Sequence, residues 1–257
     1  MRNTVINLLS VVPMRREAAH RSEQVSQLLF GEYAEILEEA GDFVLVKSLY
    51  DDYEGWVQTN QLKLVDDVFI TDTYIGDWCQ EVLVGGKRVR ASMCSPVYET
   101  QDKGISVGGT EIQYLQGNAG PFWNTGENKF NKDNLRLVYE KFVNTPYLWG
   151  GKSVFGIDCS GFAQQVYKVF GVKLLRDAYL QAEQGTGVQS IEETRLGDLA
   201  FFHNEKGRVT HVGIMLDEKQ IVHASGRVRI DRIDKDGILN MKTGKRTHQL
   251  HSIRRFF

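Results

Sequence analysis

The sequence predicts an α+β protein in which a strand-rich N-terminal half precedes a domain that begins with helices. Two observations support this. Residues 1–127 alternate short apolar segments with Gly and Asp turns, as small β-barrels do, and residues 128–257 change to a helical period before strands return. At 257 residues the chain also exceeds the size at which one hydrophobic core usually stops growing. We therefore expect domains at 1–65, 66–127 and 128–257.

The first two domains are expected to be small β-barrels built from short strands. In both, the predicted strands are separated by glycine or aspartate turns, such as Gly41-Asp42 and Gly85-Gly86. The strands are expected at 5–12, 33–38, 43–49 and 55–58 in the first domain, and at 81–84, 87–93, 96–98 and 111–115 in the second.

The third domain is expected to contain two helices followed by a mostly antiparallel sheet. Leu135, Val138, Tyr139 and Phe142 form one apolar helical stripe, which must end before Pro146. A second amphipathic helix is predicted at 160–170, where Gly171 follows as a residue that tolerates positive φ. The strands are expected at 199–203, 208–216, 220–224 and 251–256.

The composition excludes several classes of partner. Lys plus Arg number 31 against 33 Asp plus Glu, so no excess of cations favours nucleic acid. The longest apolar runs, 5–14 and 43–46, fall short of the roughly 20 residues that a membrane helix needs, so no membrane is expected as a partner. The start lacks the pattern of a secretory signal, so we expect a cytoplasmic protein. The three cysteines have no CxxC spacing, which argues against disulfides and a zinc site.

Cys159 is the candidate nucleophile. It lies between a glycine-rich loop and the start of the second predicted helix. Unpaired N–H groups and the helix dipole favour a thiolate at such a position, so we expect a lowered pKa for this thiol. Cys79 and Cys94 lack this setting, and we interpret them as small buried hydrophobes.

Two histidines on predicted strands could complete a catalytic group. His211 shares a strand face with Gly213, which is too small to block it, and His223 follows on the next predicted strand. Adjacent strands would bring the two imidazoles within reach, so that one orients the other. A lone strand histidine is more often structural, but two of them after a helix-start cysteine favour a Cys-His-polar triad. The remaining histidines are expected to be surface or packing residues: His20, His203, His248 and His251.

Five short motifs follow one another in the last 111 residues of the chain. They are Tyr147-x-Trp149-Gly-Gly, Asp158-Cys-Ser-Gly-Phe, Gly197-Asp-Leu-x-Phe-Phe, His211-Val-Gly-Ile and His223-Ala-Ser. In this order they resemble the NlpC/P60-type cysteine peptidases of bacterial cell-wall metabolism. The resemblance covers about residues 128–257, and the preceding β-domains resemble the bacterial SH3-like modules that accompany this domain in some members. It implies a papain-like catalytic domain, and we expect no metal or other cofactor.

The resemblance also implies roles for individual residues. Cys159 would be the nucleophile, His211 the base and His223 the residue that orients the base. Tyr147 and the backbone N–H of Cys159 would stabilise the oxyanion. Substrate contacts would come from Glu17, Tyr53, Trp149, Asp158, Ser160, Arg176 and Asp177. Relatives often have Ser where this chain has Ala178, which puts one substrate hydrogen bond in doubt.

The implied substrates are murein stem peptides with a free N-terminal L-Ala, cleaved between γ-D-Glu and meso-diaminopimelate or L-Lys. An acidic wall formed by Glu17, Asp158 or Asp177 would attract the alanine ammonium, so cross-linked murein should be a poor substrate and a recycling role is favoured. Two alternatives stay open. The chain could bind wall peptides with a vestigial catalytic domain, or it could be a cysteine-dependent acyltransferase.

Overall fold

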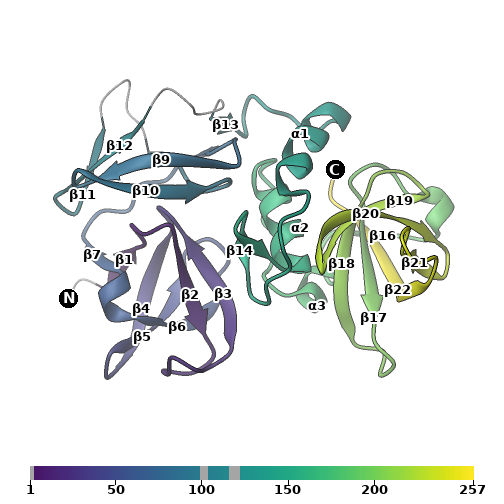
Figure 1. Cartoon of the computed structure of the whole chain (residues 1–257), viewed down its shortest axis with the longest axis horizontal. Helices are drawn as coiled ribbons and strands as arrows, with labels where there is room; N and C mark the ends of the chain where they lie inside the picture. Colours follow the sequence, from purple (N-terminus) through teal and green to yellow (C-terminus); the bar gives the residue numbers. More distant parts are fainter. Residues whose placement is uncertain (1–2, 99–103, 116–121) are drawn as a thin grey trace. The chain divides into compact units, whose positions relative to one another are not determined.

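The computed structural model describes residues 3–98, 104–115 and 122–257, and the chain forms two compact units (Figure 1). Unit 1 contains residues 1–128 together with 149–155. Unit 2 contains residues 129–148 and 156–257. The sequence analysis assigned 149–155 to the third domain, whereas the structure packs this segment with the N-terminal β-modules.

The first module of unit 1 is an antiparallel sheet that curls around an apolar core. Among the described residues its strand order is β3-β2-β6-β5-β4-β1-β7. Period-two patterning in β5, where Val44 and Val46 are buried, directs alternate side chains into this core. The strands are β1 (Thr4–Ile6), β2 (Val11–Arg15), β3 (Gln24–Leu29), β4 (Tyr33–Ala40), β5 (Phe43–Ser48), β6 (Glu54–Gln58) and β7 (Lys63–Val65), with a short 3-10 helix, η1 (Thr59–Gln61), before β7.

The second module shares a hydrophobic core with the first. In the part of the module that the structure describes, a sheet of order β10-β9-β12-β11 lies beside the pair β13-β8. Phe30 and Tyr33 of the first module belong to the same buried cluster as Val82 and Tyr98 of the second. The boundary after residue 65 stays a prediction. The strands are β8 (Thr73–Tyr74), β9 (Cys79–Val84), β10 (Lys87–Ser92), β11 (Ile105–Val107), β12 (Thr110–Tyr114) and β13 (Trp123–Asn124).

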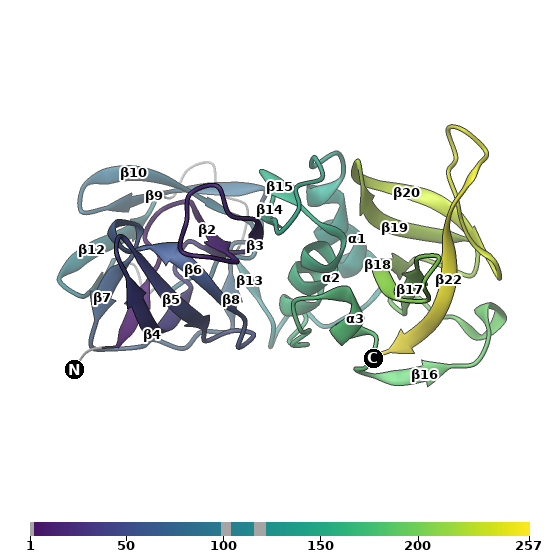
Figure 2. The same ribbon diagram turned by 90° about the horizontal axis from the view of Figure 1, so that it is seen from below.

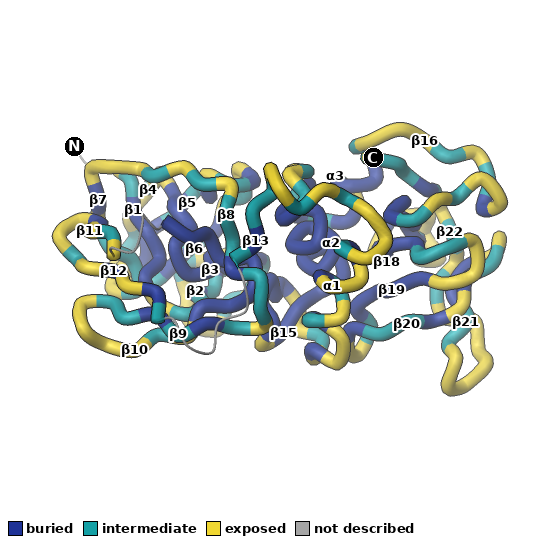
Figure 3. The backbone as a smooth tube through the Cα atoms, turned by 90° about the horizontal axis from the view of Figure 1, so that it is seen from above, coloured by how far each residue is buried: buried dark blue, intermediate teal, exposed yellow. Residues whose placement is uncertain are grey.

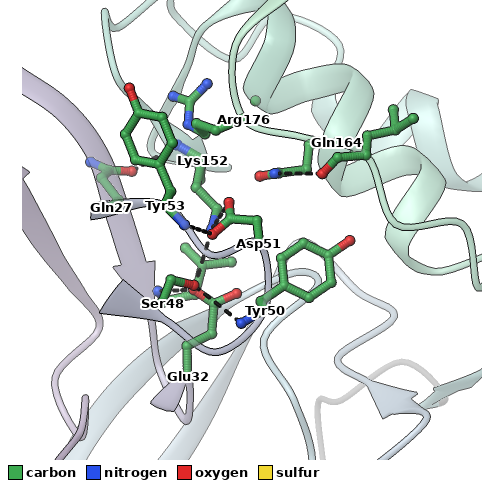
Figure 4. Close-up of polar contacts among 12 residues, drawn as sticks. Gln27, Glu32, Ser48, Tyr50, Asp51, Tyr53, Lys152, Gln164 and Arg176 are labelled. Carbon is green, nitrogen blue, oxygen red and sulfur yellow. Dashed lines mark hydrogen bonds and ion pairs between the residues drawn. The ribbon is translucent and has the colours of Figure 1, made fainter. Parts of the chain in front are cut away.

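Residues 149–155 are held in unit 1 by a buried group of charges, which we call the lysine cluster (Figure 4). Lys152 Nζ lies 3.4 Å from a carboxylate oxygen of Glu32 and 3.9 Å from one of Asp51, and each side chain is at most 3% exposed. The backbone N–H of Lys152 donates to Gln27 at 2.8 Å. A lysine that sequence reasoning did not single out therefore anchors a segment that ends four residues before Cys159.

Unit 2 begins with two helices, and each starts directly after its N-cap residue. Asn131 caps α1 (Lys132–Phe142) by accepting from the Asn134 N–H at 2.9 Å. Helix α2 (Cys159–Lys168) is buried along its whole length (Figure 3). It starts at Cys159 rather than at residue 160 and ends at Lys168 rather than at 170, while Gly171 has φ +77°. The short helices α3 (Ala178–Gln181) and η2 (Ile191–Glu193) follow.

The sheet of unit 2 closes into a barrel. Its order is β16-β22-β17-β18-β19-β20-β21, and β22 also pairs with β21. Helix α2 packs against β18 and β19, and Figure 2 shows the helices of this unit gathered on one side of the barrel. The elements are β15 (Gly156–Ile157), β16 (Thr186–Val188), β17 (Leu199–His203), β18 (Val209–Met215), β19 (Gln220–Ser225), β20 (Arg227–Asp234), β21 (Gly237–Leu239) and β22 (Arg246–Arg255), while β14 (Lys152–Ser153) belongs to unit 1.

Most of the predicted elements exist, but the strand expected at 96–98 is only an isolated bridge at Pro96, and many short elements, such as β3, β16 and α3, were not predicted. The strand expected at 5–12 is two strands, β1 and β2, because the chain bends at residues 9–10. The strand expected at 251–256 starts at Arg246, and β20 and β21 were not predicted. No helix in the described ranges has the length and apolar character to cross a membrane.

Candidate active site

Cys159 is the first residue of α2, and its sulfur lies against β18. Asp158 is the N-cap residue and accepts from the Gly161 N–H at 2.6 Å, which fixes the helix start at the cysteine. The sulfur is 3.9 Å from the Thr210 carbonyl oxygen, and the backbone N–H groups of Ser160 and Val212 donate toward it. The thiol therefore lies beside the strand position that His211 occupies.

The expected low pKa of Cys159 is wrong. Burial, followed by the negative charge of Asp158, raises the pKa of the thiol to about 12. The backbone donors and Arg176 act in the opposite direction but do not outweigh these two effects. The helix start thus supplies hydrogen bonds to the sulfur, while removal from water keeps the resting thiol protonated.

His211 and His223 form a buried hydrogen-bonded pair, as the strand argument predicted. Strands β18 and β19 are antiparallel neighbours, with Gly213 opposite His223. The two rings meet through His211 Nε2 and His223 Nδ1 at 2.8 Å. Burial lowers the pKa of His211 well below its usual range, so its resting imidazole is neutral and can accept a proton.

Asp231 on β20 continues this pair, and sequence reasoning missed it. Its Oδ2 lies 3.1 Å from His223 Nε2 and accepts from Arg229 Nε at 2.8 Å. We call His211, His223, Asp231 and Arg229, which are hydrogen-bonded to one another in this order, the histidine chain. Arg229 and Asp231 are two residues apart and therefore share one face of β20, the strand that pairs with β19. This spacing could have indicated Asp231, but the strand itself was not predicted.

His248 is a packing residue, as expected, but its partner is the candidate base. Its ring stacks on that of His211 with centroids 4.1 Å apart and an interplanar angle of 24°. Burial, with help from His223 and Arg229, lowers the pKa of His248 to about 4, so it stays neutral near pH 7. A neutral ring therefore covers one face of the His211 imidazole.

Tyr147 is half-buried in unit 2, and its backbone N–H donates to the Gly226 carbonyl at 3.0 Å. Burial raises the pKa of its hydroxyl, and the neighbouring Cys159 and Asp158 add to this effect. The phenol keeps its proton and can donate it in a hydrogen bond, which is what the predicted oxyanion role requires.

Three of the predicted substrate contacts bind one another. Arg176 donates to both carboxylate oxygens of Asp158, at 2.7 and 3.0 Å, and to Ser160 Oγ at 2.9 Å. Asp158 was expected to contribute to an acidic wall, but the guanidinium neutralises its charge and its side chain caps α2. Asp177 precedes α3, whose first residue is Ala178.

Glu17, Tyr53 and Trp149 lie in unit 1. Glu17 is exposed, and Tyr53, the residue before β6, is partly buried. Trp149 is 59% exposed, and its Nε1 donates to Glu23 Oε1 at 2.7 Å. Sequence reasoning overlooked Glu23, whose pKa is lowered by its hydrogen bonds from Arg16 and Trp149. The roles of the three predicted residues stay predictions.

No group of three or more His, Cys, Asp or Glu side chains suited to a metal ion occurs in the part of the chain that the structure describes.

Comparison with known proteins places this geometry in a family. Residues 144–247 match the NlpC/P60 family, and residues 14–62 match the bacterial dipeptidyl-peptidase SH3 domain. The γ-D-glutamyl-L-lysine dipeptidyl-peptidase of Bacillus subtilis (strain 168) is 30% identical over 215 residues, which cover 77% of this chain and 71% of that protein. The chain belongs to the NlpC/P60 family. The dipeptidyl-peptidase 6 of Lysinibacillus sphaericus is 29% identical over 245 residues, or 83% of this chain and 86% of that one.

The fold agrees with that of a solved NlpC/P60 protein. The crystal structure of an NlpC/P60 family protein from Bacillus cereus ATCC 10987 superimposes with a TM-score of 0.79 at 20% identity, covering 98% of this chain and 99% of that one. The predicted fold class, an NlpC-type domain behind small SH3-like β-modules, is confirmed. This chain is thus a member of a cell-wall peptidase family.

Proposed function

We propose that this NlpC/P60 protein is a cysteine peptidase that hydrolyses the bond between γ-D-Glu and a diamino acid in murein stem peptides. One observation carries the proposal: a buried thiol at a helix start lies beside the strand position of His211, which is hydrogen-bonded to His223 at 2.8 Å. The names of relatives that cleave γ-D-glutamyl-L-lysine bonds support the substrate class.

Acylation begins from a neutral pair. Because the Cys159 thiol is protonated and His211 is neutral at rest, the thiol proton moves to the imidazole as sulfur attacks the γ-carbonyl carbon of D-Glu. Tyr147 and the Cys159 N–H would stabilise the oxyanion, at about 3 kcal/mol per donor. The carbon–nitrogen bond then breaks, and His211 donates its proton to the departing amine.

Deacylation reuses the same groups. Water attacks the thioester carbonyl and gives one proton to His211, the carbon–sulfur bond breaks, and the proton returns to the sulfur. The products are L-Ala-D-Glu and a peptide or amino acid that begins with the diamino acid. The attack by sulfur and the later attack by water each need His211 neutral beforehand, which its lowered pKa provides.

A requirement for a free N-terminal alanine belongs to the proposal. Asp177 of unit 2 is a proposed contact to this end of the substrate, and Glu17 and Tyr53 of unit 1 are the candidates that the sequence alone suggests. Asp158 is left out of the acidic group because Arg176 neutralises it. This requirement would favour released stem peptides over cross-linked murein, and therefore recycling in the cytoplasm, a location proposed from the sequence.

The test of the nucleophile is mass spectrometry of products from L-Ala-γ-D-Glu-L-Lys and its meso-diaminopimelate counterpart. We expect wild-type protein to release L-Ala-D-Glu and Cys159→Ala to release none above background. Cys79→Ala, a change at a half-buried cysteine of unit 1, is the matched control and should keep wild-type turnover. Full turnover by Cys159→Ala would overturn the assignment.

The substrate end is tested separately with N-acetylated peptides. Acetylation removes the ammonium charge, so we expect cleavage to fall by at least about tenfold. Equal cleavage of free and acetylated peptides would remove the proposed contacts at the alanine amine while leaving the nucleophile assignment intact.

A further inference from the structure

Asp231 is placed to control which nitrogens of the histidine chain carry protons. It is 2% exposed, and its Oδ2 lies 3.1 Å from Nε2 of the fully buried His223. Its other oxygen, Oδ1, accepts from the Met241 N–H at 2.9 Å. Burial opposes ionisation of Asp231, but the hydrogen bonds from His223, Met241 and Arg229 outweigh it and lower its pKa.

An ionised carboxylate can only accept hydrogen bonds, so His223 must carry its proton on Nε2. The Nδ1 atom of a neutral His223 then has no proton and accepts from His211 Nε2, 2.8 Å away. His211 in turn holds its proton on Nε2 and keeps Nδ1 unprotonated. Nδ1 is the nitrogen that takes no part in the bond to His223, so it is the one available to accept the thiol proton.

We propose that Asp231 is a positioning residue that fixes the tautomers of His223 and His211, and thereby makes His211 Nδ1 the base for Cys159. This proposal rests on the proposed peptidase function. Asp231 also stabilises the imidazolium that forms during attack, because its carboxylate accepts a hydrogen bond from His223. It touches neither substrate nor sulfur and acts only through the two rings.

Among the charged groups around His211 and His223, Asp231 is the one that stabilises a positive charge on the two rings. The titratable or charged groups that act on the two rings are Arg229 and Asp231 from β20 and His248 from β22, and the Cys159 sulfur lies beside Thr210, the residue before His211. Arg229 opposes a positive charge on the rings and His248 is neutral near pH 7, so Asp231 is the group among them that favours imidazolium.

Asp234 offers a matched control on the same strand. It also lies on β20 and makes a charged pair, with Arg246 at 2.6 Å, but that pair is partly exposed and includes no histidine. Asp231→Asn and Asp234→Asn therefore remove the same charge from the same strand with and without contact to the rings.

The experiment measures kcat, KM and the pH profile on L-Ala-γ-D-Glu-L-Lys. For Asp231→Asn we expect kcat to fall about 10- to 100-fold with little change in KM, because an amide can donate to His223 and reverse both tautomers. The acid limb of kcat/KM should move to lower pH, since loss of the carboxylate makes imidazolium harder to form. Asp231→Glu should recover part of kcat, and Asp234→Asn should match wild type.

Nitrogen-15 histidine spectra of the wild-type protein test the same idea without any variant. At pH 7 we expect protons on Nε2 of both His211 and His223. A proton on His211 Nδ1 instead, or a fall in kcat for Asp231→Asn with an unmoved acid limb, would overturn the proposal. Failure of the peptidase function is a different result: wild-type protein would not cleave the peptide at all, whatever the tautomers.

Discussion

The lysine cluster of unit 1 and the histidine chain of unit 2 both bury charge, but they are built differently. In the lysine cluster one ammonium lies between the carboxylates of Glu32 and Asp51, and all three side chains are nearly inaccessible. In the histidine chain one carboxylate serves Arg229 and His223, and a second imidazole continues from His223 toward the strand position beside Cys159.

The difference lies in what the charged groups contact. In the lysine cluster the ammonium of Lys152 contacts two carboxylates of unit 1, so the cluster holds residues 149–155 in place. In the histidine chain, burial lowers the pKa of both imidazoles and keeps them neutral at rest, so His211 has an unprotonated nitrogen that can accept a proton. Asp231 then stabilises the positive charge. One arrangement therefore stabilises, and the other is suited to move a proton.

The largest expected effect is loss of stability in Lys152→Met. This change leaves two buried carboxylates without their ammonium, so we expect the free energy of unfolding to fall by about 3–5 kcal/mol, measured by urea denaturation. Lys47→Met is the control, because Lys47 pairs with Asp52 at 3.4 Å in an exposed setting and should cost at most about 0.5 kcal/mol. Equal, small losses in both variants would show that the lysine cluster does not hold the segment.

The next effect concerns the thiol beside the histidine chain. Since the pKa of Cys159 is raised to about 12, its thiolate fraction increases with pH throughout the neutral range. We expect the rate of alkylation by iodoacetamide to rise about tenfold per pH unit between roughly pH 7 and 9, followed at each cysteine by peptide mass spectrometry. A rate that is already constant below pH 7 would mean a preformed thiolate and imidazolium, contrary to the neutral resting pair.

A smaller effect is expected from Gly213→Ala, which tests the geometry of the histidine pair. An added Cβ would lie 2.7 Å from Ile221 Cδ1 and 2.9 Å from His223 Cβ. We expect a loss of about 1–3 kcal/mol in unfolding free energy and a lower kcat, because His223 must shift. Gly187→Ala, where the nearest atom is 3.7 Å away, should change neither quantity. An unchanged kcat in Gly213→Ala would show that catalysis tolerates movement of His223.

Local patterns predicted the parts of the fold that depend on neighbours in sequence. The apolar stripe from Leu135 to Phe142 gave helix α1, and the position of Cys159 before an amphipathic stretch gave a cysteine at a helix start. Strand β20 was not predicted because its charged residues interrupt the apolar pattern, and Asp231, which lies on it, was therefore not predicted either. The anchoring of Lys152 was equally hidden, since its partners are 120 and 101 residues earlier in the chain.

By itself the sequence determined the order of the motifs, the helix-start cysteine and the two strand histidines, because spacing and periodicity act over a few residues. The tertiary structure decided what those groups can do. Burial reversed the expected pKa shift of Cys159, strand pairing brought Asp231 to His223, and Arg176 neutralised Asp158. Desolvation and long-range pairing depend on which distant segments exclude water from a side chain, and no local pattern records that.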